Sequence, residues 1–108
     1  MGRNEIHYIV VFCTVPRGKG EELADILVKE KVAACVNVVN GLRSFYWWKG
    51  NIERDDEELL IIKTSTEKFE TLEKTIKENH PYTVPEIIAL PIIAGNPDYL
   101  KWIDESVK

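Results

Sequence analysis

The chain has 108 residues, of which 44% are apolar and 30% are charged, and its formal net charge is −4. This length predicts a single domain over residues 1–108 with its own hydrophobic core, and the acidic balance argues against a broad nucleic-acid-binding face. No apolar run approaches the roughly 20 residues that cross a bilayer, and no signal-peptide pattern precedes the first strand-like segment. We therefore expect a cytoplasmic protein without membrane insertion.

The first half of the chain predicts a strand, a helix and a long hairpin. Residues 6–13 are β-branched and aromatic, which is typical of a strand buried on both faces. Residues 21–34 have the spacing of an amphipathic helix, with acidic residues at the start and basic residues towards the end. Two strands follow, at 35–48, where Asn-Gly predicts a bulge or a bend, and at 52–64. Both exceed the usual five or six residues, so we expect the hairpin to overhang the sheet and to pair with another chain.

The second half predicts a helix, a stiff loop and a further strand. A hydroxyl side chain, Ser65 or Thr66, is expected to cap a helix that ends at Asn79. Residues 80–85 contain two prolines and cannot be helical. Residues 86–94 predict a fourth strand, and the proline inside it marks an edge strand or a bulge.

A last helix is predicted over residues 98–107, because an Asn-Pro pair precedes it. The resulting order, β-α-β-β-α-β followed by a helix, predicts an α+β ferredoxin-like fold. Right-handed crossovers favour an antiparallel sheet in which the fourth strand lies next to the first, then the third, then the second.

This topology brings together residues that are candidate metal ligands. Cys13 ends the first strand, Glu86 begins the neighbouring fourth strand, and the preceding loop carries His80 to the same edge. A thiolate and an imidazole suit copper or zinc, so Cys13, His80 and Glu86 predict a divalent-cation site. The simpler alternatives are a buried apolar role for Cys13 and a backbone-bonded loop role for His80. Cys35 starts the second strand at the opposite edge, so we expect no disulfide with Cys13.

An aromatic block at residues 45–48 lies next to the predicted hairpin tip. Strand alternation puts Tyr46 and Trp48 on one face and the other two aromatic side chains on the opposite face. One copy of the chain cannot cover both faces, which predicts a subunit interface or a ligand cleft. The alternative is that the last helix covers one face through Tyr99 and Trp102.

Three further patterns bear on function. Lys63 ends an apolar strand run, where a lysine extends its amine to solvent or binds an anionic ligand. The acidic run 53–58 predicts a solvated strand face that deters aggregation.

The sequence has no phosphate-cradling glycine loop and no GxSxG turn, so we expect no enzymatic activity.

Five short motifs occur in order along nearly the whole chain. They are Ala33-Ala34-Cys35-Val36-Asn37, Ser44-x-Tyr46-x-Trp48-x-Gly50, Lys63-Thr64, His80-Pro81-Tyr82-x-x-Pro85-Glu86 and Tyr99-Leu100-x-Trp102. In this order and at this spacing, they resemble the CutA family of divalent-cation tolerance proteins.

The resemblance implies a ferredoxin-like homotrimer that takes part in tolerance of copper and other divalent cations. It also implies copper binding through the cysteine that ends the first strand and a pair of histidines, which here correspond to Cys13, Asn79 and His80. Asn79 departs from the pair, and an amide is a poorer copper ligand than an imidazole. We therefore expect a cytoplasmic, non-enzymatic homotrimer that binds a divalent cation, such as Cu²⁺, through Cys13 and His80, with Glu86 assisting.

The alternative function also follows from the trimer that the resemblance implies. Its architecture is similar to that of nitrogen-regulatory signalling proteins, which bind small metabolites between subunits. By this analogy the chain is a signalling or scaffold trimer that binds a small anion or a partner protein in inter-subunit clefts. The residues expected to line such a cleft are Tyr46, Trp48, Lys63, Tyr82 and Glu86.

Overall fold

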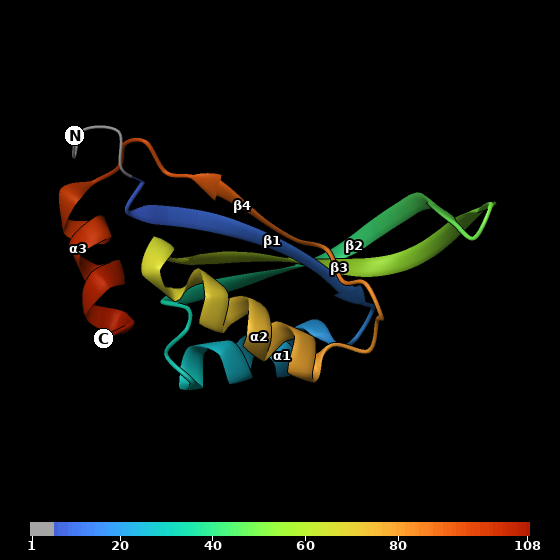
Figure 1. Cartoon of the computed structure of the whole chain (residues 1–108), viewed down its shortest axis with the longest axis horizontal. Helices are drawn as coiled ribbons and strands as arrows, with labels where there is room; N and C mark the ends of the chain where they lie inside the picture. Colours follow the sequence, from blue (N-terminus) through green and yellow to red (C-terminus); the bar gives the residue numbers. More distant parts are fainter. Residues whose placement is uncertain (1–5) are drawn as a thin grey trace.

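A computed structural model describes residues 6–108 as four strands, three α-helices and one short 3-10 turn (Figure 1). In chain order these are β1 (Tyr8–Pro16), α1 (Gly20–Lys29), β2 (Cys35–Trp48), β3 (Asn51–Ser65), η2 (Thr66–Lys68), α2 (Phe69–Asn79), β4 (Ile87–Pro91) and α3 (Pro97–Ser106). The strands form one antiparallel sheet in the order β2-β3-β1-β4. This architecture confirms the predicted fold class, strand order and additional last helix.

The ends of several elements differ from the prediction. Helix α1 ends at Lys29 because Lys31 adopts a positive φ of 59°, and the buried apolar residues 32–34 lead into β2 as an irregular, bent segment. Strand β1 begins later than predicted and continues to Pro16, where it still pairs with β3. Strand β4 is shorter than predicted and ends at Pro91.

The two predicted helix caps have different outcomes. Neither Ser65 nor Thr66 caps α2, since the Thr66 hydroxyl instead donates to the Ile6 carbonyl at 2.6 Å and a 3-10 turn precedes the helix. For α3 the prediction is confirmed, because the Asn96 side chain accepts a hydrogen bond from the Asp98 amide at 3.0 Å. Within residues 6–108, no helix is both long and apolar enough to span a membrane.

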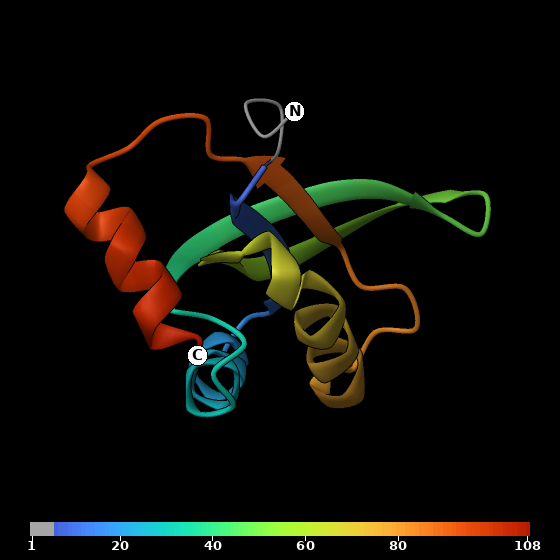
Figure 2. The same ribbon diagram turned by 60° about the vertical axis from the view of Figure 1, so that its left-hand side comes forward.

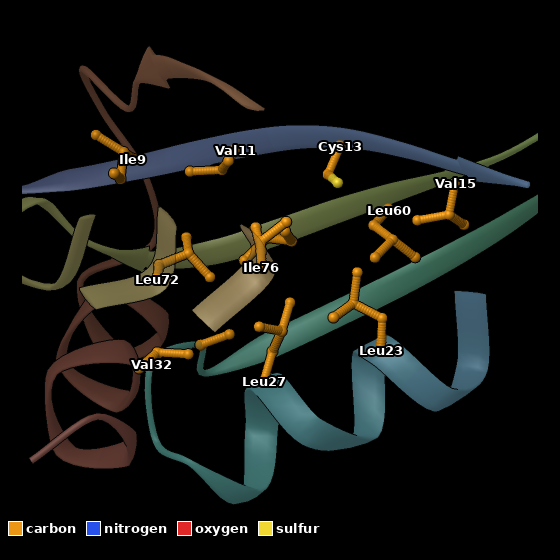
Figure 3. Packing of buried hydrophobic residues seen from close by; sticks show 12 residues of the cluster. Ile9, Val11, Cys13, Val15, Leu23, Leu27, Val32, Leu60, Leu72 and Ile76 are labelled. Carbon is orange, nitrogen blue, oxygen red and sulfur yellow. The ribbon is translucent and has the colours of Figure 1, made fainter. Parts of the chain in front are cut away.

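Helices α1 and α2 lie side by side and cover one face of the sheet (Figure 2). Every second residue of β1 points into this layer, where Figure 3 shows the strand above Leu23 and Leu27 of α1 and Ile76 of α2. The inward-facing residues of β1 are Ile9, Val11, Cys13 and Val15. The alternate residues are only half-buried, so the prediction that β1 is buried on both faces is wrong for one copy of the chain.

The sheet face turned away from α1 and α2 is called the outer face here. Helix α3 packs against Tyr8 and Ala34 at one end of the sheet and leaves much of the outer face open. The strand register places these apolar residues on it: Val10, Phe12, Val39, Leu59, Ile61, Ile88 and Leu90. Val39, Ile88 and Leu90 are exposed, so one copy of the chain leaves an apolar sheet surface in contact with water.

The β2–β3 hairpin extends beyond the other strands, as predicted. Pairing of β3 with β1 ends at Glu57, and the rest of the hairpin pairs only within itself. The predicted bulge is present between Val39 and Leu42, with Gly41 at a positive φ of 82°. Figure 1 places α3 and the hairpin tip at opposite ends of the molecule. The alternative in which Tyr99 and Trp102 cover the aromatic block is therefore wrong, and these two rings pack against each other.

Candidate functional site

The segment between α2 and β4 crosses the end of β1 and is held there by His80. The His80 ring nitrogen Nε2 lies 2.7 Å from the Thr14 carbonyl oxygen, and Nδ1 lies 3.1 Å from the Tyr82 backbone nitrogen. A carbonyl only accepts and an amide only donates, so this geometry fits the neutral tautomer that carries its proton on Nε2. Both nitrogens are therefore engaged with the backbone, as in the simpler alternative for this residue.

The Cys13 side chain is fully buried and points towards the helices (Figure 3). Burial raises the pKa of its thiol from 9.0 to about 12, and the negative charges of Glu86 and Glu57 act in the same direction. The thiol is therefore protonated at neutral pH and occupies the place of a small apolar residue.

The structure brings Cys13, His80 and Glu86 to one end of the sheet, where the topology predicted them. Cys13 pairs in register with Ile87, directly after Glu86, and His80 bonds to the residue that follows Cys13. Asn79 does not join them, since its side-chain amide donates to the Thr75 carbonyl. Among residues 6–108, no group of three or more Cys, His, Asp or Glu side chains is placed to hold a metal ion. Metal binding by these residues stays a prediction.

The two cysteines are free and far from a disulfide arrangement, as expected. Cys13 lies opposite Leu60 and Cys35 lies opposite Lys63, so β3 separates them and their side chains face opposite sides of the sheet.

We expect the Cys13 thiol to resist chemical modification in the folded protein. In a Cys35→Ser variant, which keeps this single thiol, an aromatic disulfide reagent at about pH 8 should react only after the chain unfolds, because the thiolate is the nucleophile. The pKa of the Cys13 thiol is higher in the folded chain, about 12, than in the unfolded chain, 9.0. The protonated thiol therefore favours the folded state, fully at a pH below 9.0, and this contribution to the free energy of unfolding is lost as the pH rises towards 12. Rapid reaction in the absence of denaturant would contradict this account.

A cleft of about 670 Å³ lies between the hairpin and the loop that precedes β4. Tyr46, Trp48, Tyr82 and Glu86 line it within one chain, and their predicted place in a cleft between subunits stays a prediction. Lys63 does not, because it pairs with Cys35 at the other end of β3 and its ammonium group donates to the Asn37 side chain. An anion-binding role for Lys63 stays a prediction, and within one chain it is separate from this cleft.

Sequence reasoning missed Glu57, the most buried acidic residue in the cleft. It belongs to the acidic run that was predicted to be solvated, yet its exposed fraction is 5%. The Tyr82 hydroxyl donates to its carboxylate at 2.7 Å. Burial, followed by this hydrogen bond and the negative charge, raises the pKa of Tyr82 well above 10.0. Tyr46 donates likewise to Asp55, which raises its pKa to about 12.

Glu58 is the second exception in the acidic run, with an exposed fraction of 7%. It faces the helices, where its carboxylate accepts hydrogen bonds from the Gly18 amide at 3.0 Å and the Gly20 amide at 2.8 Å. These amides lie at the start of α1, where the helix dipole favours a negative charge. The strand pattern contained a signal for this burial, because Glu58 shares its parity with the buried residues Leu60 and Ile62.

Comparisons with known proteins agree with this fold and these motifs. Residues 9–106 match the family described as "CutA1 divalent ion tolerance protein". The chain belongs to the CutA1 family. Its relatives include a divalent-cation tolerance protein CutA from Thermus thermophilus, which is 50% identical over 98 residues that cover 90% of this chain and 95% of the relative.

Solved CutA1 structures have the same fold. That of CutA1 from Oryza sativa superposes with a TM-score of 0.92 at 49% identity, covering 95% of each chain. That of the Thermus thermophilus protein gives a TM-score of 0.90 at 48% identity, covering 94% of this chain and 99% of the other. This chain spans 57% and 56% of the length of the chloroplastic CutA relatives from Oryza sativa and Arabidopsis thaliana, respectively. The names of these CutA1 relatives refer to divalent-cation tolerance or to CutA itself.

Proposed function

We propose that the chain is one subunit of a cytoplasmic, non-enzymatic homotrimer that contributes to tolerance of divalent cations and binds Cu²⁺ at the His80 end of the sheet. Membership of a family described by divalent ion tolerance supports the role. The observation that supports the site is that Cys13, His80 and Glu86 come from separate segments to the same end of the sheet. Cys13 and His80 supply soft sulfur and nitrogen ligands, and Glu86 assists.

Binding at this position requires a local rearrangement. Both His80 nitrogens bond to the backbone, so a cation must displace either the Thr14 carbonyl or the Tyr82 amide. Cys13 must lose its proton and turn away from the core. Because binding releases this proton, the affinity is expected to rise with pH.

The test is a calorimetric titration of metal-free protein with Cu²⁺ against a chelator of known affinity. We expect whole-number stoichiometry per subunit, and affinity at least about tenfold weaker in His80→Gln and in Cys13→Ser. Cys35→Ser is the matched control, since its thiol lies on the other face of the sheet. Unchanged Cu²⁺ affinity in a folded Cys13→Ser/His80→Gln double variant would overturn the site.

The open outer face supports assembly. Helices α1 and α2 cover the opposite face, and α3 covers only one end of the outer face. Apolar side chains of β2 and β4 are exposed, and Trp47 on the hairpin is 73% exposed. Strand β2 has 14 residues and lies at the edge of the sheet, where unpaired backbone groups are available to another strand. A second copy of the chain would bury these surfaces, and the number three follows from the CutA resemblance.

Light scattering should give a mass three times the subunit mass of 12.4 kDa. An Ile88→Lys substitution places a charge on the outer face and should shift the protein towards monomers. Val28→Lys is the control, because Val28 is exposed on helix α1, away from the outer face. A monomeric mass for the unmodified protein at micromolar concentration would contradict assembly.

A further inference from the structure

We propose that the cleft beside Glu57 binds a small organic cation, an aliphatic amine whose ammonium group is held by Glu57 and Glu86 and whose alkyl portion packs against the aromatic walls. This inference does not depend on Cu²⁺ binding at His80, because neither Cys13 nor His80 lines the cleft and Glu86 alone belongs to both proposals.

The first argument is the uncompensated charge of Glu57. Its neighbour Glu58 is equally buried but accepts hydrogen bonds from two backbone amides at a helix N-terminus. Glu57 accepts one hydrogen bond from the Tyr82 hydroxyl, and no salt bridge to it forms within residues 6–108. Buried charges in proteins are normally paired, so this carboxylate is suited to an incoming cation.

The second argument is the sign of the charge around the cleft. Glu86 adds a second carboxylate to the lining, and the described residues that line the cleft include no lysine, arginine or histidine. Asp55 lies close by, where it accepts a hydrogen bond from Tyr46. The charged side chains that line the cleft are therefore acidic, which favours a cation over an anion inside it. Among the described residues, basic side chains lie behind the aromatic walls, where Lys49 is 5.9 Å from the Trp48 ring and Arg54 is 5.6 Å from the Phe45 ring.

The third argument is the chemistry of the walls. Tyr46, Trp48 and Tyr82 present aromatic rings, which attract ammonium groups and pack against alkyl chains. A volume of about 670 Å³ also matches clefts that hold small organic molecules.

The position of the cleft suggests how the ligand would be enclosed. Glu57 and Tyr46 lie on the outer face, since Glu57 shares its parity with Leu59 and Tyr46 pairs with Glu53 on the same side of β3. In the proposed trimer, a neighbouring subunit would close the open side of the cleft.

The experiment is a titration with 1,4-diaminobutane at low ionic strength, followed by calorimetry and tryptophan fluorescence. We expect saturable binding with a change in tryptophan emission, and affinity at least about tenfold weaker in Glu57→Gln, which keeps the side-chain shape and an acceptor for Tyr82. Glu86→Gln should weaken binding as well, and the exposed Glu105→Gln on α3 should leave it unchanged. Neutral 1,4-butanediol is the matched ligand control.

Each contrary outcome overturns the proposal. Absence of diamine binding would mean that the cleft is not a ligand site, and equal binding of the diol would mean that charge does not select the ligand. Displacement of the diamine by an equal concentration of Mg²⁺ would assign the carboxylates to a metal instead. Loss of Cu²⁺ binding in the His80 variant with diamine binding intact would support this cleft independently of the metal proposal.

Discussion

Replacing Glu58 by alanine should lower the free energy of unfolding by about 2–4 kcal/mol, because it leaves the buried Gly20 amide at the start of α1, and the part-buried Gly18 amide before it, without their acceptor. A side chain at Gly20 would disturb the same contact, since an added Cβ would lie 2.5 Å from the Glu58 carboxylate and 2.8 Å from Val38. Urea denaturation at one fixed protein concentration measures the effect, because assembly makes stability depend on concentration.

Glu53→Ala is the matched control for this substitution. It removes an exposed carboxylate from the same strand and should change stability by less than about 0.5 kcal/mol. If the Glu58 and Glu53 variants unfold at the same urea concentration, the carboxylate does not anchor the helix.

Replacing Ile76 by alanine should cost about 3–5 kcal/mol, because the side chain is fully buried between α2 and β1 and its removal leaves a cavity. Ile93→Ala makes the same chemical change at a position that is 88% exposed, and we expect an effect below about 0.5 kcal/mol. Thermal unfolding of both variants checks the difference. Comparable losses in the two would mean that the α2 contact contributes little to the core.

The fold could be predicted because helices and strands are marked in the sequence by periodic apolar residues and by short local motifs. Alternating apolar residues marked the strands, and the Asn-Pro pair marked the start of α3. The end of α1 was misplaced because residues 32–34 continue the apolar pattern of a helix although they form a buried, bent segment outside it. The position of α3 had no local signal, since it depends on where the sheet ends rather than on the helix's own residues.

The candidate site could be predicted only for those residues that the strand order alone brings together. Antiparallel pairing of β1 with β4 predicted that Cys13 and Glu86 would lie close together. Burial of Glu57 was not predicted, because it depends on the loop that carries Tyr82 folding back over the sheet. Lys63 and Tyr46 lie at opposite ends of the long β2–β3 hairpin, so they are far apart within one chain. The analogy that grouped them was drawn from the trimer architecture and took no account of where each residue lies along the hairpin.

The bulge at Asn40–Gly41 has a consequence for insertions and deletions. Val39 and Tyr46 are seven residues apart, so a regular strand would direct them to opposite sides of the sheet. The one extra residue in β2 at the bulge reverses the alternation of the side chains that follow it. Val39 and Tyr46 therefore both face the same side of the sheet as Glu57. Evolution can therefore lengthen or shorten the hairpin by paired residues near its tip and keep the cleft. A single-residue change between Leu42 and Trp48 would instead move Tyr46 and Trp48 to the side of the strand opposite Glu57.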